Sequence, residues 1–343
     1  MEEPKTIMIF EKPEMYFFPA YEGKIFSPYG VKPGSLKYWI YRGMNLLHIK
    51  ASSMFWGEWK EHIADAKQVI VFDYGYQWGM EQYIRKKNPE CKVYLFYWNI
   101  ITPKRINYKL FQEKEAIYST DHGDCKKYGF QYNDMFYGRK YLEAFKRNPD
   151  LQLENIEKAV QSGLQQEIAE EKENSKIQSK GMEKKGRIFF LGADKGRGRE
   201  LYTWKNYLEK AGLRCDFNIL WTSKDKAYQE ELSGILLKQP LSYEEYLRKA
   251  AQADILLEIV QAGQQAPSMR VMEAIYLSKK LISNNAYLKE FDFYNENNIY
   301  ILPREVTQGE EAKLKKFLET PFQEYSDDIL EKYDEPAWEK RFH

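Results

Sequence analysis

The stretch 192–199 reads Gly-Ala-Asp-Lys-Gly-Arg-Gly-Arg and directly follows an apolar run. Glycines let a backbone approach a phosphate closely, while lysine and arginine supply positive charge and hydrogen-bond donors. A helix that begins here would add its free N–H groups. The spacing fits neither G-x-G-x-x-G nor a P-loop, so neither motif is predicted. We predict that Gly192, Lys195 and Arg197 contribute to phosphate binding; a flexible basic turn and an RNA-contacting loop are the open alternatives.

A second stretch, 261–273, has a similar character. An apolar run ends, a glycine-containing loop follows, and a Pro-Ser pair opens a helix, whose N-terminus suits an anion. Arg270 in the first turn could pair with a diphosphate, and Glu273 one turn later could accept hydrogen bonds from a ribose diol. The alternative is that these two only form an ion pair on a solvated helix face. Gln264, Ser268 and Met269 are the other residues of this stretch that we predict to contact the bound diphosphate compound.

Removing a proton from a reacting hydroxyl needs a carboxylate or a histidine. Asp73 is the first candidate, because it ends the apolar strand 68–72; its alternative role is a strand-end turn residue. Asp121 is the second, and its context, Thr-Asp-His-Gly-Asp, also fits the N-cap of a helix. His122 is a third candidate for the base.

These residues need elements that position them, and the sequence predicts two blocks of alternating strands and helices. Such alternation predicts parallel, doubly wound sheets, whose ligands bind beyond the carboxyl ends of the strands. Strands are predicted at 6–10, 68–72, 92–98 and 116–119, and then at 187–191, 214–220, 254–260, 280–283 and 298–302. Helices are predicted at 77–87, 200–211 and 268–279, and after Ser242, which forms a capping box with Glu245.

The same pattern divides the chain into an N-terminal domain over 1–145 and a C-terminal domain over 187–320. The connecting segment 146–186 begins with an apolar stripe at every fourth residue and becomes polar, which predicts a docked helix and a flexible linker. A helix lying on a membrane is the alternative there. Trp338 and Phe342 are too apolar for a free tail, so we expect 321–343 to form a helix that returns to the N-terminal domain.

The second block also resembles the donor half of GT-B glycosyltransferases, most of all bacterial enzymes of capsule, exopolysaccharide or lipopolysaccharide synthesis. The resemblance lies in Ser-Tyr-Glu-Glu-Tyr-Leu at 242–247, Ala-Asp-Ile-Leu-Leu-Glu-Ile at 253–259, Ser-Met-Arg-Val-Met-Glu-Ala-Ile at 268–275, and the stretches 279–285, 292–295 and 298–299. The first block is similar more loosely, through 97–99, 118–121 and 124–129. One departure is Ala-Pro-Ser at 266–268, where such enzymes carry a Gly-Leu-Thr-like turn.

The resemblance implies two Rossmann-like domains that face each other across a cleft. It implies a metal-independent hexosyltransferase that uses a nucleotide sugar, a UDP-sugar first of all, as co-substrate and needs no other cofactor. Arg270 would contact the donor diphosphate and Glu273 the ribose, with Lys195 and Arg197 as secondary phosphate contacts. The acceptor would be a cell-surface polysaccharide or a lipid-linked glycan. A non-catalytic homologue that binds nucleotide or glycan and a nucleotide-sugar epimerase of the same fold are the alternatives.

Composition limits the partners and the location. The 343 residues include 52 basic and 51 acidic side chains, a balance that argues against a dedicated nucleic-acid binder. The three cysteines and four histidines show no spacing typical of a metal site. The N-terminus lacks the pattern of a signal peptide, and no apolar run approaches the ~18 residues that span a bilayer. We therefore expect a cytoplasmic protein, with peripheral contact at the inner face of a membrane left open.

Overall fold

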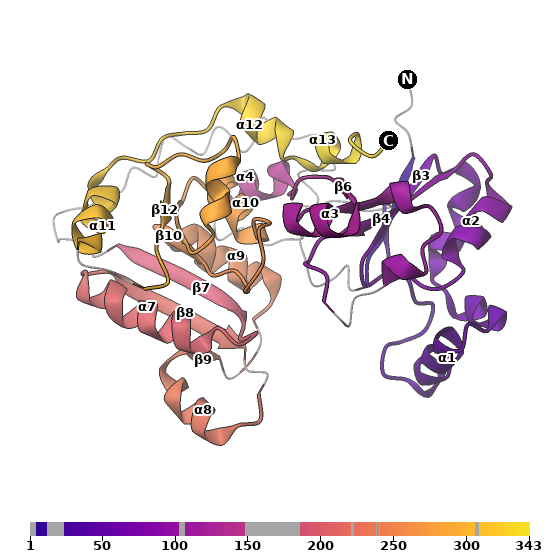
Figure 1. The fold of residues 1–343 in the computed structure, drawn as a ribbon, viewed down its shortest axis with the longest axis horizontal. Coiled ribbons are helices and arrows are strands. Elements are labelled where there is room, and N and C mark those ends of the chain that lie inside the picture. Colours follow the sequence, from indigo (N-terminus) through magenta and orange to yellow (C-terminus); the bar gives the residue numbers. More distant parts are fainter. Residues whose placement is uncertain are drawn as a thin grey trace. The chain divides into compact units, whose positions relative to one another are not determined.

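A computed structural model of the protein describes residues 5–11, 24–102, 107–147, 186–220, 223–237, 239, 241–305 and 309–343. The chain forms two units, shown in Figure 1. Unit 1 comprises 1–135 and 336–343, and unit 2 comprises 136–335. The predicted segment 146–186 lies almost entirely outside the described residues. Each unit is built around its own sheet of six parallel strands, so the α/β fold predicted from the alternation of strands and helices is confirmed.

Unit 1 has the strand order β2-β1-β3-β4-β5-β6. Its strands are β1 (Thr6–Ile9), β2 (Ile25–Phe26), β3 (Gln68–Phe72), β4 (Lys92–Tyr97), β5 (Ile117–Ser119) and β6 (Gln131–Tyr132). Its helices are α1 (Leu36–Leu46), α2 (Met80–Lys87) and α3 (His122–Tyr128), with short 3-10 turns at η3 (Lys50–Phe55), η4 (Glu58–Glu61), η5 (Ile63–Asp65), η6 (Asn107–Lys109) and η7 (Lys114–Ala116). All four residues of β1 and the last four of β3 are buried, as expected for central strands covered on both faces.

Unit 2 has the strand order β12-β11-β10-β7-β8-β9. Its strands are β7 (Arg187–Ala193), β8 (Arg214–Leu220), β9 (Leu236–Leu237), β10 (Ile255–Glu258), β11 (Lys280–Ser283) and β12 (Ile299–Ile301). Its helices are α4 (Arg139–Arg147), α7 (Gly198–Lys210), α8 (Lys226–Glu231), α9 (Tyr243–Gln252), α10 (Met269–Tyr276), α11 (Glu310–Glu319) and α12 (Asp327–Lys332), and its 3-10 turns are η9 (Ser233–Ile235) and η10 (Ala286–Glu290). Helix α13 (Glu335–Glu339) begins at the last residue of this unit.

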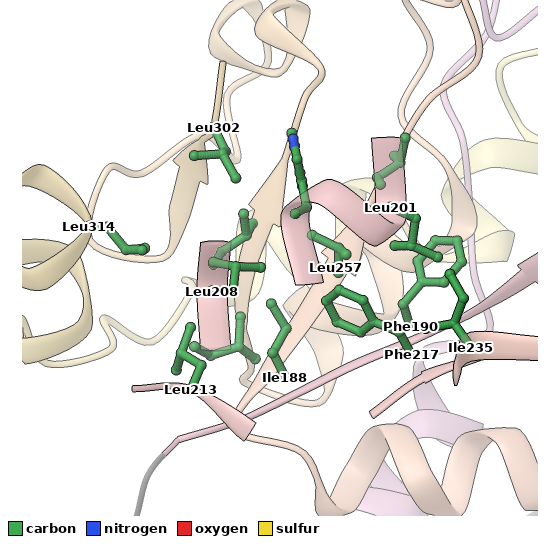
Figure 2. Close-up of a cluster of buried hydrophobic side chains, with 14 of the residues drawn as sticks. Ile188, Phe190, Leu201, Leu208, Leu213, Phe217, Ile235, Leu257, Leu302 and Leu314 are labelled. Atoms are coloured by element: carbon green, nitrogen blue, oxygen red, sulfur yellow. The ribbon is translucent and has the colours of Figure 1, made fainter. Parts of the chain in front are cut away.

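The core of unit 2 forms where α7 packs against the sheet, as Figure 2 shows. Leu201, Trp204 and Leu208 recur at helical spacing on one face of α7 and are all fully buried. They pack in one cluster with side chains of β7 and β8 that include Ile188 and Phe217. This packing fixes where α7 begins, directly after the end of β7, and so fixes the loop between them.

Helix α4 belongs to unit 2, since it contacts α9 and α10. The chain therefore passes from unit 1 to unit 2 before α4. It returns to unit 1 at α13. Trp338 of this helix packs on the ring of Phe96 in β4, and Phe342, just beyond the helix, packs on Tyr94 of the same strand. Both Trp338 and Phe342 are buried.

Candidate functional site

The strand order of unit 2 marks one position as favourable for a ligand. The chain runs outward from β7 to β9 and then places β10 on the other side of β7, so the loops after β7 and β10 diverge. In doubly wound sheets, ligands bind beyond the carboxyl ends of the strands at such a switch point. The loop after β7 leads into α7, and the loop after β10 leads into α10. Both predicted phosphate-binding stretches therefore lie at this switch point.

Arg197, the N-cap residue of α7, turns its guanidinium back across the end of β7. It donates hydrogen bonds to the carbonyl oxygens of Ala193, at 3.3 and 3.4 Å, and of Ile259. Its guanidinium carbon lies 5.4 Å from the ring centroid of Phe190. A Cβ at Gly192 would lie 3.0 Å from the Arg197 Nη2 atom and 3.2 Å from the Phe190 ring, so glycine leaves room for this arrangement.

Arg270 reaches the same ring from the first turn of α10. Its guanidinium carbon lies 4.8 Å from the Phe190 centroid, and the group donates to the carbonyl oxygen of Leu191. The Nε atom of Arg270 is buried and has no hydrogen-bond partner among the described residues. The structure therefore gathers two guanidinium groups, predicted separately from two stretches of sequence, around one aromatic ring at the end of β7.

The electrostatics of this arginine pair favour an anion. Burial lowers the pKa of Arg197 to about 10, and repulsion from the neighbouring charge of Arg270 adds to the effect. Arg197 still carries its charge at neutral pH, because a pKa of about 10 is well above it. A diphosphate would offset both the repulsion and the lost hydration, since arginine forms strong charge-assisted hydrogen bonds with phosphate oxygens. Helices α7 and α10 both begin at this edge of the sheet, so the positive ends of their dipoles add to the charge of the arginine pair.

Glu258 fixes the start of α10 through a hydrogen bond. This last residue of β10 is fully buried; its carboxylate accepts hydrogen bonds from the backbone N–H of Ser268 at 2.7 Å and from the hydroxyl of Ser283 at 2.5 Å. Burial raises the pKa of Glu258. The predicted donor contact Ser268 is thus the N-cap residue of α10, and its backbone N–H is bonded to protein.

Glu273 lies one turn after Arg270, and only 1% of it is exposed. One carboxylate oxygen accepts a hydrogen bond from the Tyr243 hydroxyl at 3.0 Å, and the other accepts one from Tyr246. Burial raises the pKa of Glu273 to about 7, against the opposing effect of the Arg270 charge. Glu273 is thus buried, and each of its carboxylate oxygens is bonded to a tyrosine hydroxyl, so the ribose contact stays a prediction.

The other predicted donor contacts lie at the margin of this cluster. Lys195 is exposed in the turn after β7 and has a left-handed backbone conformation, with φ at 47°. Gln264 bonds within its own loop, where its side-chain amide donates to the carbonyl of Ala266 at 3.1 Å. Met269 is the first residue of α10 and is half-buried. The arginine pair and Gly192 are therefore the predicted residues that the structure brings into direct contact.

Asp73 occupies the corresponding switch point of unit 1, where β1 and β3 are neighbours. It directly follows β3, is buried, and its backbone N–H donates to the carbonyl of Phe96 at 3.0 Å. A Cβ at Gly75 would lie 2.6 Å from the carbonyl oxygen of Ile9, so the loop after Asp73 passes against the end of β1. The first candidate for the base therefore lies at a carboxyl end of the sheet, where the sequence predicted it.

Asp121 is the N-cap residue of α3. Its carboxylate accepts a hydrogen bond from the backbone N–H of Asp124 at 3.0 Å, which is the structural alternative considered for it. His122 stacks on the ring of Tyr132 at a centroid distance of 3.9 Å. Both residues therefore have structural roles at the start of this helix.

Reasoning from the sequence missed Phe190, Glu258, Tyr243 and Tyr246. Phe190 and Glu258 lie inside predicted strands, where an apolar or end-of-strand residue gives no signal of its own. The tyrosines stand three apart on α9, next to the cap residue Ser242, and so share a face of that helix. Their contact with Glu273 joins residues that are 27 and 30 positions apart, which only the fold reveals.

A cavity of about 810 Å³ in unit 1 is lined by Gln68 and Lys92 at the amino ends of β3 and β4, together with Pro336 and Phe342. It lies at the opposite end of the sheet from Asp73, so we assign it no role in proton removal by that residue.

In the parts of the chain that the structure describes, no helix is long and apolar enough to cross a membrane, and no three His, Cys, Asp or Glu side chains are grouped to hold a metal ion.

Comparison with known proteins supports the fold. The sequence matches no protein-family model and no curated protein. Among solved structures, it is similar to an α,α-trehalose-phosphate synthase (UDP-forming) from Burkholderia vietnamiensis, with a TM-score of 0.53 and 9% identity over 96% of this chain and 79% of that one. The trehalose-6-phosphate synthase OtsA matches with a TM-score of 0.52 and 12% identity, over 97% and 81% of the two chains.

A third match, from E. coli and described as bound with UDP-2-fluoro glucose, has a TM-score of 0.50 and 12% identity, over 97% of this chain and 84% of that one. Together with the two six-stranded parallel sheets, these similarities show that the chain has the α/β fold of GT-B glycosyltransferases. At such identities they establish the fold alone.

Proposed function

We propose that this protein transfers a sugar from a nucleoside-diphosphate donor, a UDP-sugar, to a hydroxyl group of a cell-surface polysaccharide or a lipid-linked glycan precursor. The observation that carries the proposal is the arginine pair, Arg197 and Arg270, around Phe190 at the switch point of unit 2. The GT-B fold supports it, as does the UDP-2-fluoro glucose with which one structurally similar protein is described as bound.

In this proposal the arginine pair stabilises the departing nucleoside diphosphate. Negative charge grows on the diphosphate as the bond to the sugar breaks, and preorganised donors at that position lower the barrier by about 3 kcal/mol each. The N-terminus of α10, held in place by Glu258, adds backbone N–H groups. Lys195 would close over the phosphates from its exposed turn, and Glu273 would receive the ribose. Because arginines supply the positive charge, we expect no requirement for a metal ion, and EDTA should leave the rate unchanged.

The fate of the acceptor proton depends on the stereochemistry. If the anomeric centre is inverted, Asp73 is the proposed general base, since its carboxylate follows β3 at the switch point of unit 1. Transfer with retention was studied in a trehalose-6-phosphate synthase that matches this chain with a TM-score of 0.52 and 10% identity, over 98% of each chain. If this protein also retains configuration, no such base is needed.

Thermal denaturation with UDP, GDP, CMP and dTDP tests the donor class. We expect UDP to raise the melting temperature most, because a ligand that binds the folded state stabilises it. Arg197→Gln and Arg270→Gln should each weaken UDP binding by about tenfold to a hundredfold, the loss of one charge-assisted contact. Transfer from a UDP-sugar should fall with it.

Arg199→Gln is the matched control. Arg199 lies two residues from Arg197 in the same glycine-rich stretch, but its side chain is 72% exposed and pairs with Glu231 at 3.0 Å. This variant should bind UDP as the wild type does. If it loses as much affinity as Arg270→Gln, or if Arg270→Gln keeps full affinity, the site is not where we place it.

A further inference from the structure

The exposed apolar side chains of this protein are concentrated in one segment of unit 1. Among the described residues, seven of the eleven large hydrophobic side chains that remain exposed lie between residues 36 and 54: Leu36 (76% exposed), Trp39 (63%), Ile40 (49%), Leu46 (79%), Leu47 (71%), Ile49 (41%) and Met54 (70%). Single exposed apolar residues are normal, but a contiguous group of this kind indicates an interaction surface.

Five members of the group lie on α1 or at its C-cap residue, Leu47, and form one face of the helix. At 100° per residue, Leu36, Ile40 and Leu47 project to one side of the helix, with Trp39 and Leu46 next to them. The opposite side holds Tyr38 and the fully buried Tyr41, whose rings pack on Tyr29 at centroid distances of 5.3 and 5.6 Å. The aromatic packing therefore fixes which side of α1 faces the unit and leaves the apolar side exposed. Figure 1 shows α1 at the lower margin of unit 1.

Basic residues flank this apolar face. The segment from Lys24 to Gly57 contains five lysine or arginine residues and no aspartate or glutamate, although the whole chain is nearly neutral. Lys37 and Arg42 lie on either side of the apolar stripe of α1, and Lys32 is exposed just before the helix. The carboxylate of Glu11 bonds to the Tyr29 hydroxyl, on the packed side of the helix. The exposed side thus combines apolar and cationic groups.

The combination of apolar and cationic groups indicates which partner binds this face, a second copy of the chain or a lipid surface. A second copy of the chain in a two-fold symmetric contact would bring the same basic residues against each other, which is unfavourable. An anionic lipid surface offers an apolar layer for Trp39 and Ile40 and phosphate groups for the flanking lysines, whose stems can extend to the interface. We infer that α1 is a membrane-docking helix that lies in the surface of an anionic lipid layer through Leu36, Trp39, Ile40, Leu46 and Leu47.

The docking helix adjoins the loop that carries Asp73. His48, just after α1, stacks on Trp78 at a centroid distance of 5.1 Å, and a Cβ at Gly79 would lie 3.9 Å from the Trp56 ring. The loop from Asp73 to Gly79 is thus held by the segment that touches the lipid. Given the proposed glycosyl transfer, on which this step rests, the acceptor is a glycan anchored in that membrane, and its sugar is presented at the carboxyl end of the unit 1 sheet.

Sedimentation of the full-length protein with vesicles tests the docking helix. We expect the protein to pellet with vesicles of phosphatidylcholine containing about one-third phosphatidylglycerol, and to remain in solution with phosphatidylcholine alone. Trp39→Ser/Ile40→Ser should lower partitioning by about tenfold or more, because it removes buried apolar area. Lys32→Glu/Lys37→Glu should lower it by a similar factor, because each cation near an anionic surface contributes about fivefold.

Matched controls come from unit 2. Tyr202→Ser/Tyr287→Ser removes two exposed aromatic rings, and Lys226→Glu/Lys289→Glu reverses two exposed charges, without touching α1. Both should partition as the wild type does. Equal losses in the controls, or equal binding to neutral and anionic vesicles, would overturn the inference. So would a dimer that disappears in Trp39→Ser/Ile40→Ser, because a second copy would then cover this face.

The UDP-induced rise in melting temperature, measured on the same samples, separates the two proposals. All four variants should keep that rise, and an unchanged far-UV circular dichroism spectrum and unchanged hydrogen exchange of β3 and β4 should show that unit 1 is folded in the two α1 variants. If vesicle binding is absent while the UDP effect is present, the docking helix is wrong and the proposed function stands. If the protein binds anionic vesicles through α1 but no nucleotide stabilises it, the docking helix stands and the proposed function is wrong.

Discussion

At the scale of single residues, the arginine pair is an arrangement that the folded protein maintains against electrostatic cost. Two guanidinium groups share one ring, and each donates to backbone carbonyls at the end of β7. The sequence could predict both arginines, because each stands in a glycine-containing stretch after a strand. It could not predict that they meet, because the ring of Phe190 that joins them is an ordinary residue of a buried strand.

Glu273 differs from the arginine pair, because burial favours the uncharged form of its carboxyl group. Its pKa is about 7, well above the ordinary value of 4.5, and desolvation is the main cause. Between these values the folded protein binds more protons than the unfolded chain does. The contribution of Glu273 to stability is therefore fully present below the unfolded pKa and is lost as the pH rises through about 7.

Glu273→Gln should remove this pH dependence. Between about pH 4.5 and pH 7, the wild type should lose about 3 kcal/mol of unfolding free energy relative to the variant, which follows from the size of the pKa shift. Urea unfolding of both proteins at several pH values measures the difference. Glu319→Gln, at an exposed position of α11, is the control and should follow the wild type. Parallel curves for wild type and Glu273→Gln would show that the carboxyl group is not perturbed.

At the scale of elements, the apolar runs were the most informative feature of the sequence. The runs at 187–191 and 254–260 became β7 and β10, because central strands buried on both faces need continuous apolar residues. The edge strands β2, β6 and β9 have two residues each and were missed, since so short a strand leaves no period to detect. Helix α1 was missed for another reason: its apolar residues face outward, so they do not mark a core.

Helix α10 depends on a residue that the sequence did not indicate. Glu258 joins β10 to β11 through Ser283 and to the first turn of α10 through the N–H of Ser268. Since Arg270 stands in that first turn, the position of its guanidinium depends on this buried carboxylate. Such dependence arises from tertiary contacts between strands and a helix, which a residue-by-residue pattern does not contain.

Replacing Glu258 tests this dependence. Glu258→Ala should lower the unfolding free energy by about 3 kcal/mol, because it leaves two buried donors without their acceptor, whereas Glu258→Gln should cost about 1 kcal/mol. Both variants should also weaken UDP binding, Glu258→Ala more than Glu258→Gln. Asp225→Ala removes the side-chain cap of α8 and should also cost about 1 kcal/mol, but without an effect on UDP. Unchanged UDP affinity in a folded Glu258→Gln and a folded Glu258→Ala would show that the first turn of α10 is placed by other contacts.

At the scale of the whole molecule, the two units have separate cores although the chain passes between them twice. Residues 336–343 belong to unit 1, where Trp338 is fully buried between the rings of Phe96, Phe72 and Phe342 at centroid distances of 5.0, 6.0 and 4.9 Å. Asn133 also donates to the Trp338 carbonyl at 3.2 Å. The last residues of the chain thus complete a core that its first residues begin, so unit 1 depends on both ends of the sequence.

Trp338→Ala should therefore destabilise unit 1 while leaving unit 2 able to bind nucleotide. Removing a buried tryptophan costs about 3–5 kcal/mol, which should expose the amides of β3 and β4 to hydrogen exchange. The amides of β7 and β10 should stay protected, and UDP should increase their protection as in the wild type. Trp39→Ser replaces a tryptophan of the same unit that is 63% exposed, and should change the protection of β3 and β4 very little. If Trp338→Ala exposes β7 and β10 together with β3 and β4, the two cores unfold as one, and the donor site cannot be treated as a property of unit 2 alone.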